Sequence, residues 1–301
     1  MSFFLSLTVI TMLIMLVCYP ERLMDSAYRA ISVCITSVIP SLFLSVVLTK
    51  IIVSSDFIFT LTRPFGKAFR SLTGLPQCGV SVYLLSFLSG FPSGVIAGAD
   101  LYKRGVLSKK EAERLIAISN NTGPFLPMLL LGRGIFGSVS SGVIIYLIQI
   151  ASSLICAITF KESDSRKADS PLILNNRVSI VSAVTSSVEG ALRSMAMLCA
   201  YVIIFSCIND LPFLSSGIFT CIKPYIELVS GSLALNKSGF GASFVIVCSA
   251  MSFGGLSVHF QALGVVSDCK LSLSLHLRAK ALQGFVSLVL SLCYLFVMSL
   301  R

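Results

Sequence analysis

Residues 80–127 read VSVYLLSFLSGFPSGVIAGADLYKRGVLSKKEAERLIAISNNTGPFLP. Apolar sequence in this stretch is interrupted at 89–94 (SGFPSG) and again at 120–124 (NNTGP). In an aqueous protein, two such Gly/Pro breaks mark surface loops. Within a membrane, interrupted backbone must be buried in protein or line a polar cavity, because lipid cannot hydrogen-bond to it. Broken helices near the midplane are where many transporters bind substrates and ions.

The composition indicates a polytopic membrane protein. Apolar residues make up 55% of the chain and charged residues 12%, with a mean hydropathy of +0.92. The net charge of +10 fits the Lys and Arg that collect in cytoplasmic loops, and no aromatic-basic RNA motif accompanies it. The ten cysteines are scattered without a CxxC pair, so we expect reduced thiols and neither disulfides nor metal ligands.

Apolar runs of about 20 residues predict the membrane spans. We expect spanning helices at 2–19, 31–52, 138–160, 190–208 and 281–300, amphipathic connections at 53–77 and 216–235, and interrupted segments at 80–101 and 240–267. The first run lacks a basic n-region and an A-x-A site, so it is predicted to be a helix and not a signal peptide. Glu21 to Arg29 is expected to be a short polar connection, and Pro40 to kink the second span.

The two halves of the chain look alike. Arg63-Pro64-Phe65 resembles Lys223-Pro224-Tyr225, and the break at 89–94 resembles SFGGLS at 252–257 at nearly the same spacing. Repeats with paired interruptions point to a transporter site. We therefore expect a first repeat at 1–160 with an extra N-terminal span, a polar cytoplasmic linker at 161–178, and a second repeat at 179–301.

The distribution of positive charge favours a re-entrant path for 80–101. If this segment turns at Phe91-Pro92 and returns to its own side, nearly all Lys and Arg of the first half share one membrane face. A full crossing divides them less sharply, so the hairpin fits the positive-inside rule better. The second half then enters from the opposite side, which gives an inverted repeat.

Four motifs in this order are familiar. SGFPSG at 89–94, LSKKEAERL at 107–115, SNNTGP at 119–124 and FGGLSVHFQ at 253–261 resemble the YlbJ-type sporulation integral membrane proteins. The resemblance covers about residues 25–300. It implies a "gate" domain, similar to concentrative nucleoside transporters and to the membrane part of ferrous-iron transport proteins (FeoB). It also implies movement of dipicolinic acid during sporulation, in a bacterial cell membrane such as the outer forespore membrane.

One position departs from that family pattern. The first break in the family often continues Gly-Ala-Lys, whereas here Gly94 is followed by Val95-Ile96. If the family's lysine binds an anion, this chain must supply a cation from elsewhere. The candidate cations are Arg133, Arg193, Arg278 and Lys280.

Polar and small residues at the breaks are the candidate substrate-binding groups. They are Ser89, Gly90, Pro92, Ser93, Gly94, Asn120, Asn121, Thr122, Gly123, Gly254, Gly255, Ser257, His259 and Gln261. Half-helix N-termini at the first break would direct N–H groups at a carboxylate. Asn and Thr at the second could bind substrate or a cation, and His259 could carry a coupling proton. The alternatives are helix packing at the Gly/Pro kink, capping by Asn and Thr, and a packing role for the histidine.

The predicted fold is an all-α polytopic membrane protein of two inverted repeats, each with an interrupted re-entrant hairpin. There is no P-loop, GxSxG or HExxH motif, so an enzyme is not expected. We expect a carrier of a small organic anion that works by alternating access. It would need no cofactor apart from coupling Na⁺ or H⁺, and its partners would be the lipid bilayer and other copies of the chain. The alternatives are a nucleoside-type carrier and a non-transporting sporulation membrane scaffold.

Overall fold

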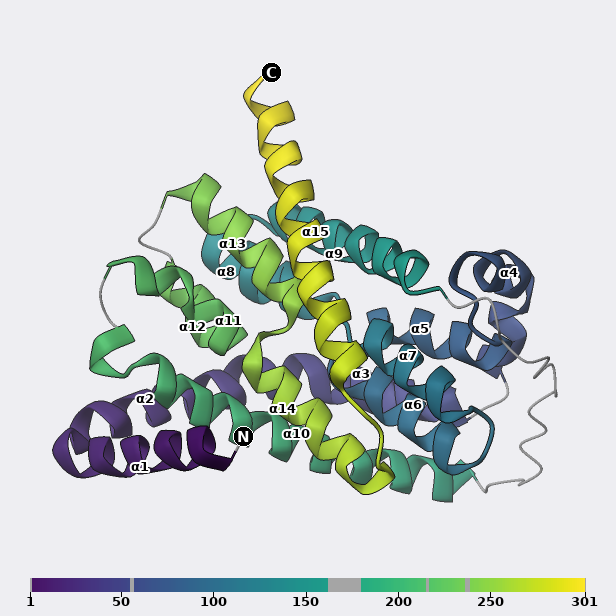
Figure 1. Ribbon diagram of the computed structural model, residues 1–301, viewed down its shortest axis with the longest axis horizontal. Coiled ribbons are helices and arrows are strands. Elements are labelled where there is room, and N and C mark those ends of the chain that lie inside the picture. Colours follow the sequence, from purple (N-terminus) through teal and green to yellow (C-terminus); the bar gives the residue numbers. More distant parts are fainter. Residues whose placement is uncertain (1, 55–56, 162–179, 215–216, 236–238, 301) are drawn as a thin grey trace.

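A computed structural model describes residues 2–54, 57–161, 180–214, 217–235 and 239–300, which are helical and contain no strand (Figure 1). Residues 162–178 of the predicted linker lie outside these ranges. Four helical segments are long and apolar enough to cross a membrane, or up to six if two bent helix pairs each count as one span. The chain is an integral membrane protein, as its composition predicts. All ten cysteines are free thiols, as expected.

The first half contains both predicted interruptions. Its elements are α1 (Ser2–Cys18), α2 (Pro20–Val33), η1 (Cys34–Val38), α3 (Ile39–Ser54), α4 (Phe57–Thr73), α5 (Gln77–Ser89), α6 (Ser93–Lys103), α7 (Lys109–Ser119), η2 (Leu126–Arg133), α8 (Gly134–Phe136) and α9 (Val139–Thr159). Helix α5 ends and α6 begins around Gly90-Phe91-Pro92, and α7 ends before residues 120–124. The helix direction changes by 58° between Pro20–Val38 and Leu42–Leu48, around Pro40, so the predicted kink is confirmed.

The second half begins with the longest helix. Its elements are α10 (Ile180–Asn209), η3 (Pro212–Leu214), η4 (Gly217–Cys221), α11 (Lys223–Ile226), α12 (Leu228–Ala234), α13 (Phe240–Phe253), α14 (Gly255–Val266), η6 (Ser267–Cys269) and α15 (Ser274–Ser299). The interruption predicted at 252–257 is confirmed, because α13 ends at Phe253 and α14 follows directly after Gly254.

Two predicted boundaries are wrong. The residues from Glu21 to Arg29 belong to helix α2 and are not a connection, because Leu23, Ser26 and Ala30 lie on one buried face. The last helix begins at Ser274 and not near 281. Its charged first turns suggest a loop in the sequence, but Lys280 within them is buried.

Helix α7 begins with a capping box formed by Ser108 and Glu111. The Ser108 hydroxyl accepts a hydrogen bond from Glu111 N at 3.3 Å, and Glu111 Oε2 accepts one from Ser108 N at 2.8 Å. These two bonds satisfy backbone donors that the first helical turn leaves free. Helix α7 is therefore fixed at its start and carries the Asn120 break at its other end.

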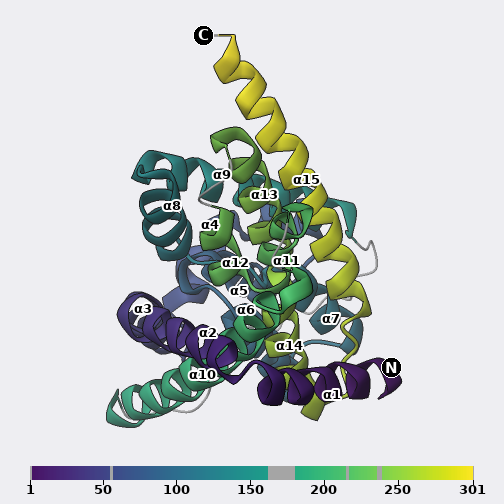
Figure 2. The same cartoon turned by 90° about the vertical axis from the view of Figure 1, so that its left-hand side faces the viewer.

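The helices enclose a central group of broken helices. Helices α1, α2 and α10 lie along one side of the molecule, and Figure 2 shows α15 extending past the others at the opposite side. One apolar core joins α5, α6 and α7 with α14, and a second joins α9, α12 and α13. Both cores combine residues from the two halves, so the halves form one packed body around the breaks.

Helix α6 packs closely against α7 through two glycines, Gly94 against the backbone and Gly98 against a side chain. A Cβ atom added to Gly94 would lie 2.0 Å from Ser119 O, and one added to Gly98 would lie 2.8 Å from Ile116 Cγ1. Small residues four apart on one helix face allow such close packing in membranes. This contact gives Gly94 a packing role, which is one of the two roles considered above.

We expect Gly94→Ala to lower the free energy of unfolding by about 1–3 kcal/mol, because the added methyl overpacks a backbone contact. The measurement is chemical unfolding in detergent. The matched control is Gly239→Ala, since a Cβ atom there meets no atom within 4 Å. Equal stability of the two variants would show that α6 and α7 are not held this closely.

Candidate functional site

The two breaks of the first half touch each other. Gly90 has φ +76°, and a Cβ atom added there would lie 2.9 Å from Gly123 N. One added to Gly123 would lie 3.1 Å from Leu88 O. The backbone at Gly90 is left-handed and closely approached, which only glycine accommodates without strain. Two breaks that are about 30 residues apart in sequence therefore form one structural unit.

The break of the second half reaches the same place. Gly254 has φ +103°, and its added Cβ atom would lie 3.7 Å from Phe91 Cζ. The neighbouring Gly255 packs against the junction of α11 and α12, since its added Cβ atom would lie 3.5 Å from Leu228 N. The breaks of both halves thus meet where Phe91 contacts Gly254.

A cavity of about 40 Å³ lies between these breaks. Its lining comes from both halves and comprises Val38, Leu42, Gly90, Phe91, Thr122, Gly123, Leu126, Leu198, Val202, Glu227, Leu228, Val229, Ser257, Val258 and Gln261. Five of the predicted site residues belong to this lining: Gly90, Thr122, Gly123, Ser257 and Gln261. The volume suits a water molecule or an ion, whereas small-molecule sites usually enclose about 300–1,000 Å³. An organic substrate therefore requires the helices to separate.

Other residues of the first break hydrogen-bond locally. The Ser93 hydroxyl donates to Gly90 O at 2.6 Å, the Ser89 hydroxyl donates to Leu85 O at 2.9 Å, and the two hydroxyls also contact each other. The carbonyl of Pro92 accepts from Val95 N at 3.0 Å. These contacts hold the turn between α5 and α6 and correspond to the structural role considered for this break.

Asn121 is the centre of a buried hydrogen-bond network. Its Oδ1 accepts from Lys280 Nζ at 3.3 Å and from Gln283 Nε2 at 3.1 Å. Its Nδ2 donates to Ile118 O at 2.8 Å and to Ser86 Oγ at 3.3 Å. One amide thus joins the end of α7 to α5 and to α15, so residues from both halves depend on it.

The network continues into α9 and across the halves. The Thr122 hydroxyl donates to Gln149 Oε1, and Ser152 Oγ lies 3.5 Å from Ser252 Oγ. Both residues of α9 involved here are fully buried. Hydroxyl and amide groups in the interior of membrane helices join neighbouring helices in this way.

Lys280 is the cation at the centre of the network. Only 1% of its surface is exposed, and its ammonium also donates to Gln283 Oε1 at 2.8 Å. The two oxygen atoms that accept from the Lys280 ammonium therefore belong to the side-chain amides of Asn121 and Gln283. No carboxylate of the described residues lies within ion-pair distance of it. A buried ammonium normally requires a counter-charge, because loss of hydration is costly. The other three candidate cations, Arg133, Arg193 and Arg278, are exposed.

The two histidines of the chain contact each other. His259 Nδ1 lies 3.1 Å from His276 Nε2, and His276 Nδ1 lies 3.4 Å from Ile116 O. The ring of Phe253 packs edge-on against His259, with 4.6 Å between ring centroids. This pair joins α14 to α15 one helical turn before Lys280.

Several buried polar atoms at the breaks have no hydrogen-bond partner among the described residues. They are both side-chain polar atoms of Asn120, Oε1 of Gln261, Nε2 of His259 and Nε2 of Gln149. Buried polar groups are nearly always paired, so a cluster of unpaired ones calls for an explanation. Two adjacent asparagines thus differ, since Asn121 has its bonds within the protein and Asn120 has none.

Five residues of the Asn121 network and of the histidine pair were not predicted from the sequence: Ser86, Gln149, Ser152, His276 and Gln283. The signal was present for Gln149 and Gln283, because each is an amide within an otherwise apolar span, and intramembrane polar groups are usually functional. Ser86 gives no such signal. His276 lies in the turn that was expected to precede the last span.

The sequence is similar to that of one characterised membrane protein. The chain is 23% identical to the sporulation integral membrane protein YlbJ of Bacillus subtilis over an alignment of 339 positions, which covers 96% of this chain and 80% of that protein. The resemblance carried by the break motifs is thereby confirmed and extends over nearly the whole chain. No family model matches the sequence, and no solved structure matches it.

Proposed function

We propose that this protein is a membrane transporter of a small organic anion that works by alternating access, with no chemical step. The observation that carries the proposal is the buried ammonium of Lys280. It lies beside the helix breaks with amide oxygens as its partners, so a substrate carboxylate would supply its counter-charge. A group that only held helices together would not need a charge there.

The order of the elements supports two repeats. Each half has a long spanning region, a short amphipathic segment, a pair of short helices, a helix pair broken at its centre and a final span. These are α2–α3, α4, α5–α6, α7–η2 and α9 in the first half, and α10, η3–η4, α11–α12, α13–α14 and α15 in the second. This order pairs the break at 120–124 with Gly254, and the break at 89–94 with Glu227, which differs from the pairing that motif similarity suggests.

The arrangement in space is compatible with inversion. In Figure 1, α5–α6 and α11–α12 lie on opposite sides of the broken helices. From α7 the chain leads toward α8 on the left of Figure 1, whereas α13 and α14 lead toward the lower right. Inverted repeats of this kind allow one bundle to rock against the other around a central site.

Dipicolinate is our leading substrate. The similarity to a sporulation membrane protein supports a role in sporulation, and the family resemblance suggests this dicarboxylate. Its carboxylates match the Lys280 ammonium, and its ring nitrogen can accept from a donor such as the amide of Asn120. The outer forespore membrane is the location that the same resemblance suggests. Nucleosides are the second candidate, because the unpaired amides of Asn120 and Gln261 suit a neutral polar ligand.

We expect dipicolinate to stabilise the purified protein against thermal unfolding more than uridine or pyridine-3-carboxylate does. Specific binding at a hundredfold excess over Kd adds about 2.7 kcal/mol to the free energy of unfolding. Uptake of labelled dipicolinate into proteoliposomes then separates a carrier from a binding scaffold. A selective shift with uridine would move the function to nucleosides. Stabilisation without uptake would favour the scaffold.

A further inference from the structure

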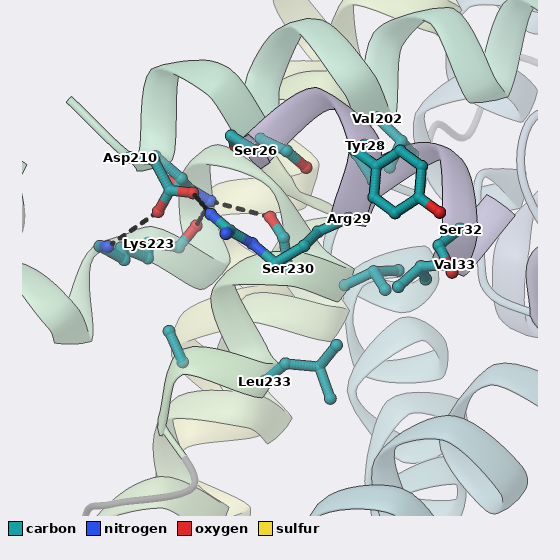
Figure 3. A pocket seen from close by; sticks show the side chains of 15 residues that line it. Ser26, Tyr28, Arg29, Ser32, Val33, Val202, Asp210, Lys223, Ser230 and Leu233 are labelled. Atoms are coloured by element: carbon teal, nitrogen blue, oxygen red, sulfur yellow. Dashed lines mark hydrogen bonds and ion pairs between the residues drawn. The ribbon is translucent and has the colours of Figure 1, made fainter. Parts of the chain in front are cut away.

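A second, larger cavity lies away from the Lys280 network. It has a volume of about 460 Å³ and lies between α2, α10, α11 and α12 (Figure 3). This volume is within the usual range of small-molecule sites. None of the predicted site residues lines it, so it is separate from the site described above.

The charged side chains of this cavity carry an excess of positive charge. Asp210 accepts from Arg29 Nη2 at 2.7 Å and lies 3.7 Å from Lys223 Nζ (Figure 3). Two cations therefore share one carboxylate. Within the described part of the chain, the Lys223 ammonium has no hydrogen bond closer than this long ion pair, although its side chain is only 10% exposed. A second carboxylate would complete the charge balance.

Two buried polar groups in the lining have no hydrogen-bond partner among the residues that the structure describes. Ser206 Oγ and Asn209 Oδ1 make no hydrogen bond to any described residue, and both residues are less than 4% exposed. The amide nitrogen of Asn209 is held in place by Lys223 O at 3.2 Å and Ser230 Oγ at 3.3 Å. The amide oxygen is thus oriented but unsatisfied, which is the condition of a group that awaits a ligand.

The larger cavity adjoins the cavity at the breaks. Val202 and Val229 line both of them, one from α10 and one from α12. A molecule held in the larger cavity would therefore lie next to the helix breaks, on the other side of these two apolar side chains.

We propose that the Arg29–Asp210–Lys223 cavity is a second binding site for a small organic anion, which holds the anion before it passes to the breaks. A carboxylate of the ligand binds between Arg29 and Lys223, another acceptor of the ligand accepts from the Ser206 hydroxyl, and Asn209 Oδ1 accepts from a ligand hydroxyl or from a water bound to the ligand. This proposal rests on the proposed function, because it assigns the same class of substrate to both sites.

Binding stoichiometry tests the proposal. Isothermal titration of the full-length protein with dipicolinate should give two sites per chain. Arg29→Gln should weaken one of them at least tenfold, and Lys280→Met should weaken the other about 10- to 100-fold. Arg29 suits this test because its side chain is 63% exposed and its loss should not prevent folding. The matched control is Arg22→Gln, on the same helix but outside the cavity lining, which should keep both sites.

The possible outcomes separate the two proposals. One site that is lost in Lys280→Met and unaffected in Arg29→Gln would overturn the second site and leave the transport function standing. A single site that is unaffected in Lys280→Met and weakened in Arg29→Gln would support the second site and contradict the Lys280 site. An absence of dipicolinate binding would overturn both.

Discussion

Replacing Lys280 with methionine is expected to weaken binding of the organic anion about 10- to 100-fold while the protein remains folded. A hydrogen bond to a charged group contributes about 1.5–3 kcal/mol, and each 1.4 kcal/mol changes Kd tenfold. Methionine has a similar length and no charge, and replacing a buried charge by an apolar group of matching size is often neutral or stabilising. The measurements are Kd by titration calorimetry and the midpoint of thermal unfolding.

Arg278→Gln is the matched control. Arg278 lies two residues earlier on α15, but it is exposed and bonds to Ser274. It should leave both affinity and transport unchanged. Unaltered affinity in Lys280→Met would show that a group other than Lys280 balances the charge of the anion. The proposed function would then lose its main support.

Asn121→Ala is expected to lower the free energy of unfolding by about 3–5 kcal/mol. Removal of this amide leaves Lys280 without one of its two hydrogen-bond acceptors inside the protein, and breaking a buried polar interaction at one partner has this order of cost. Asn120→Ala should cost less than about 1 kcal/mol, because its side chain makes no hydrogen bond that could be lost. Chemical unfolding in detergent measures both.

A double substitution checks the cause of that loss. With Lys280→Met already present, Asn121→Ala should cost clearly less, because the charge that depends on the amide is gone. Equal costs for Asn120→Ala and Asn121→Ala would contradict the network. Asn120→Ala should also weaken ligand binding while preserving stability, whereas equal affinity would assign its unpaired amide no role.

The helix breaks could be predicted from sequence because their causes are local. Gly90 and Gly254 have positive φ, and Ser108 caps α7 through a residue only three positions away. Boundaries that depend on distant contacts could not be found in this way. Helix α15 begins before Lys280 because residues of other helices bury that charge, and no local pattern reports such burial.

The candidate site was predictable in part for the same reason. Asn120, Asn121 and Thr122 stand out as polar residues at a break, and Lys280 was one of four candidate cations. Their contacts were not predictable, since Asn121 and Lys280 are 159 positions apart in the sequence and meet only in the folded chain. The difference between Asn120 and Asn121 also depends on which side chain turns toward α15, which neither residue type nor spacing reveals.

The two longest helices also set a requirement on the surrounding lipid. Helices α10 and α15 contain 30 and 26 residues, or about 45 and 39 Å of helix, whereas the hydrocarbon core of a bilayer is about 30 Å thick. They cross steeply in both views (Figures 1 and 2), so they cannot both follow the bilayer normal. At least one must tilt by roughly 40° to fit. Because α10 also forms one wall of the Asp210 cavity, membrane thickness would act directly on the spacing of that wall. We therefore expect the Asp210 cavity to differ in width between vesicles of short-chain lipids and vesicles of long-chain lipids.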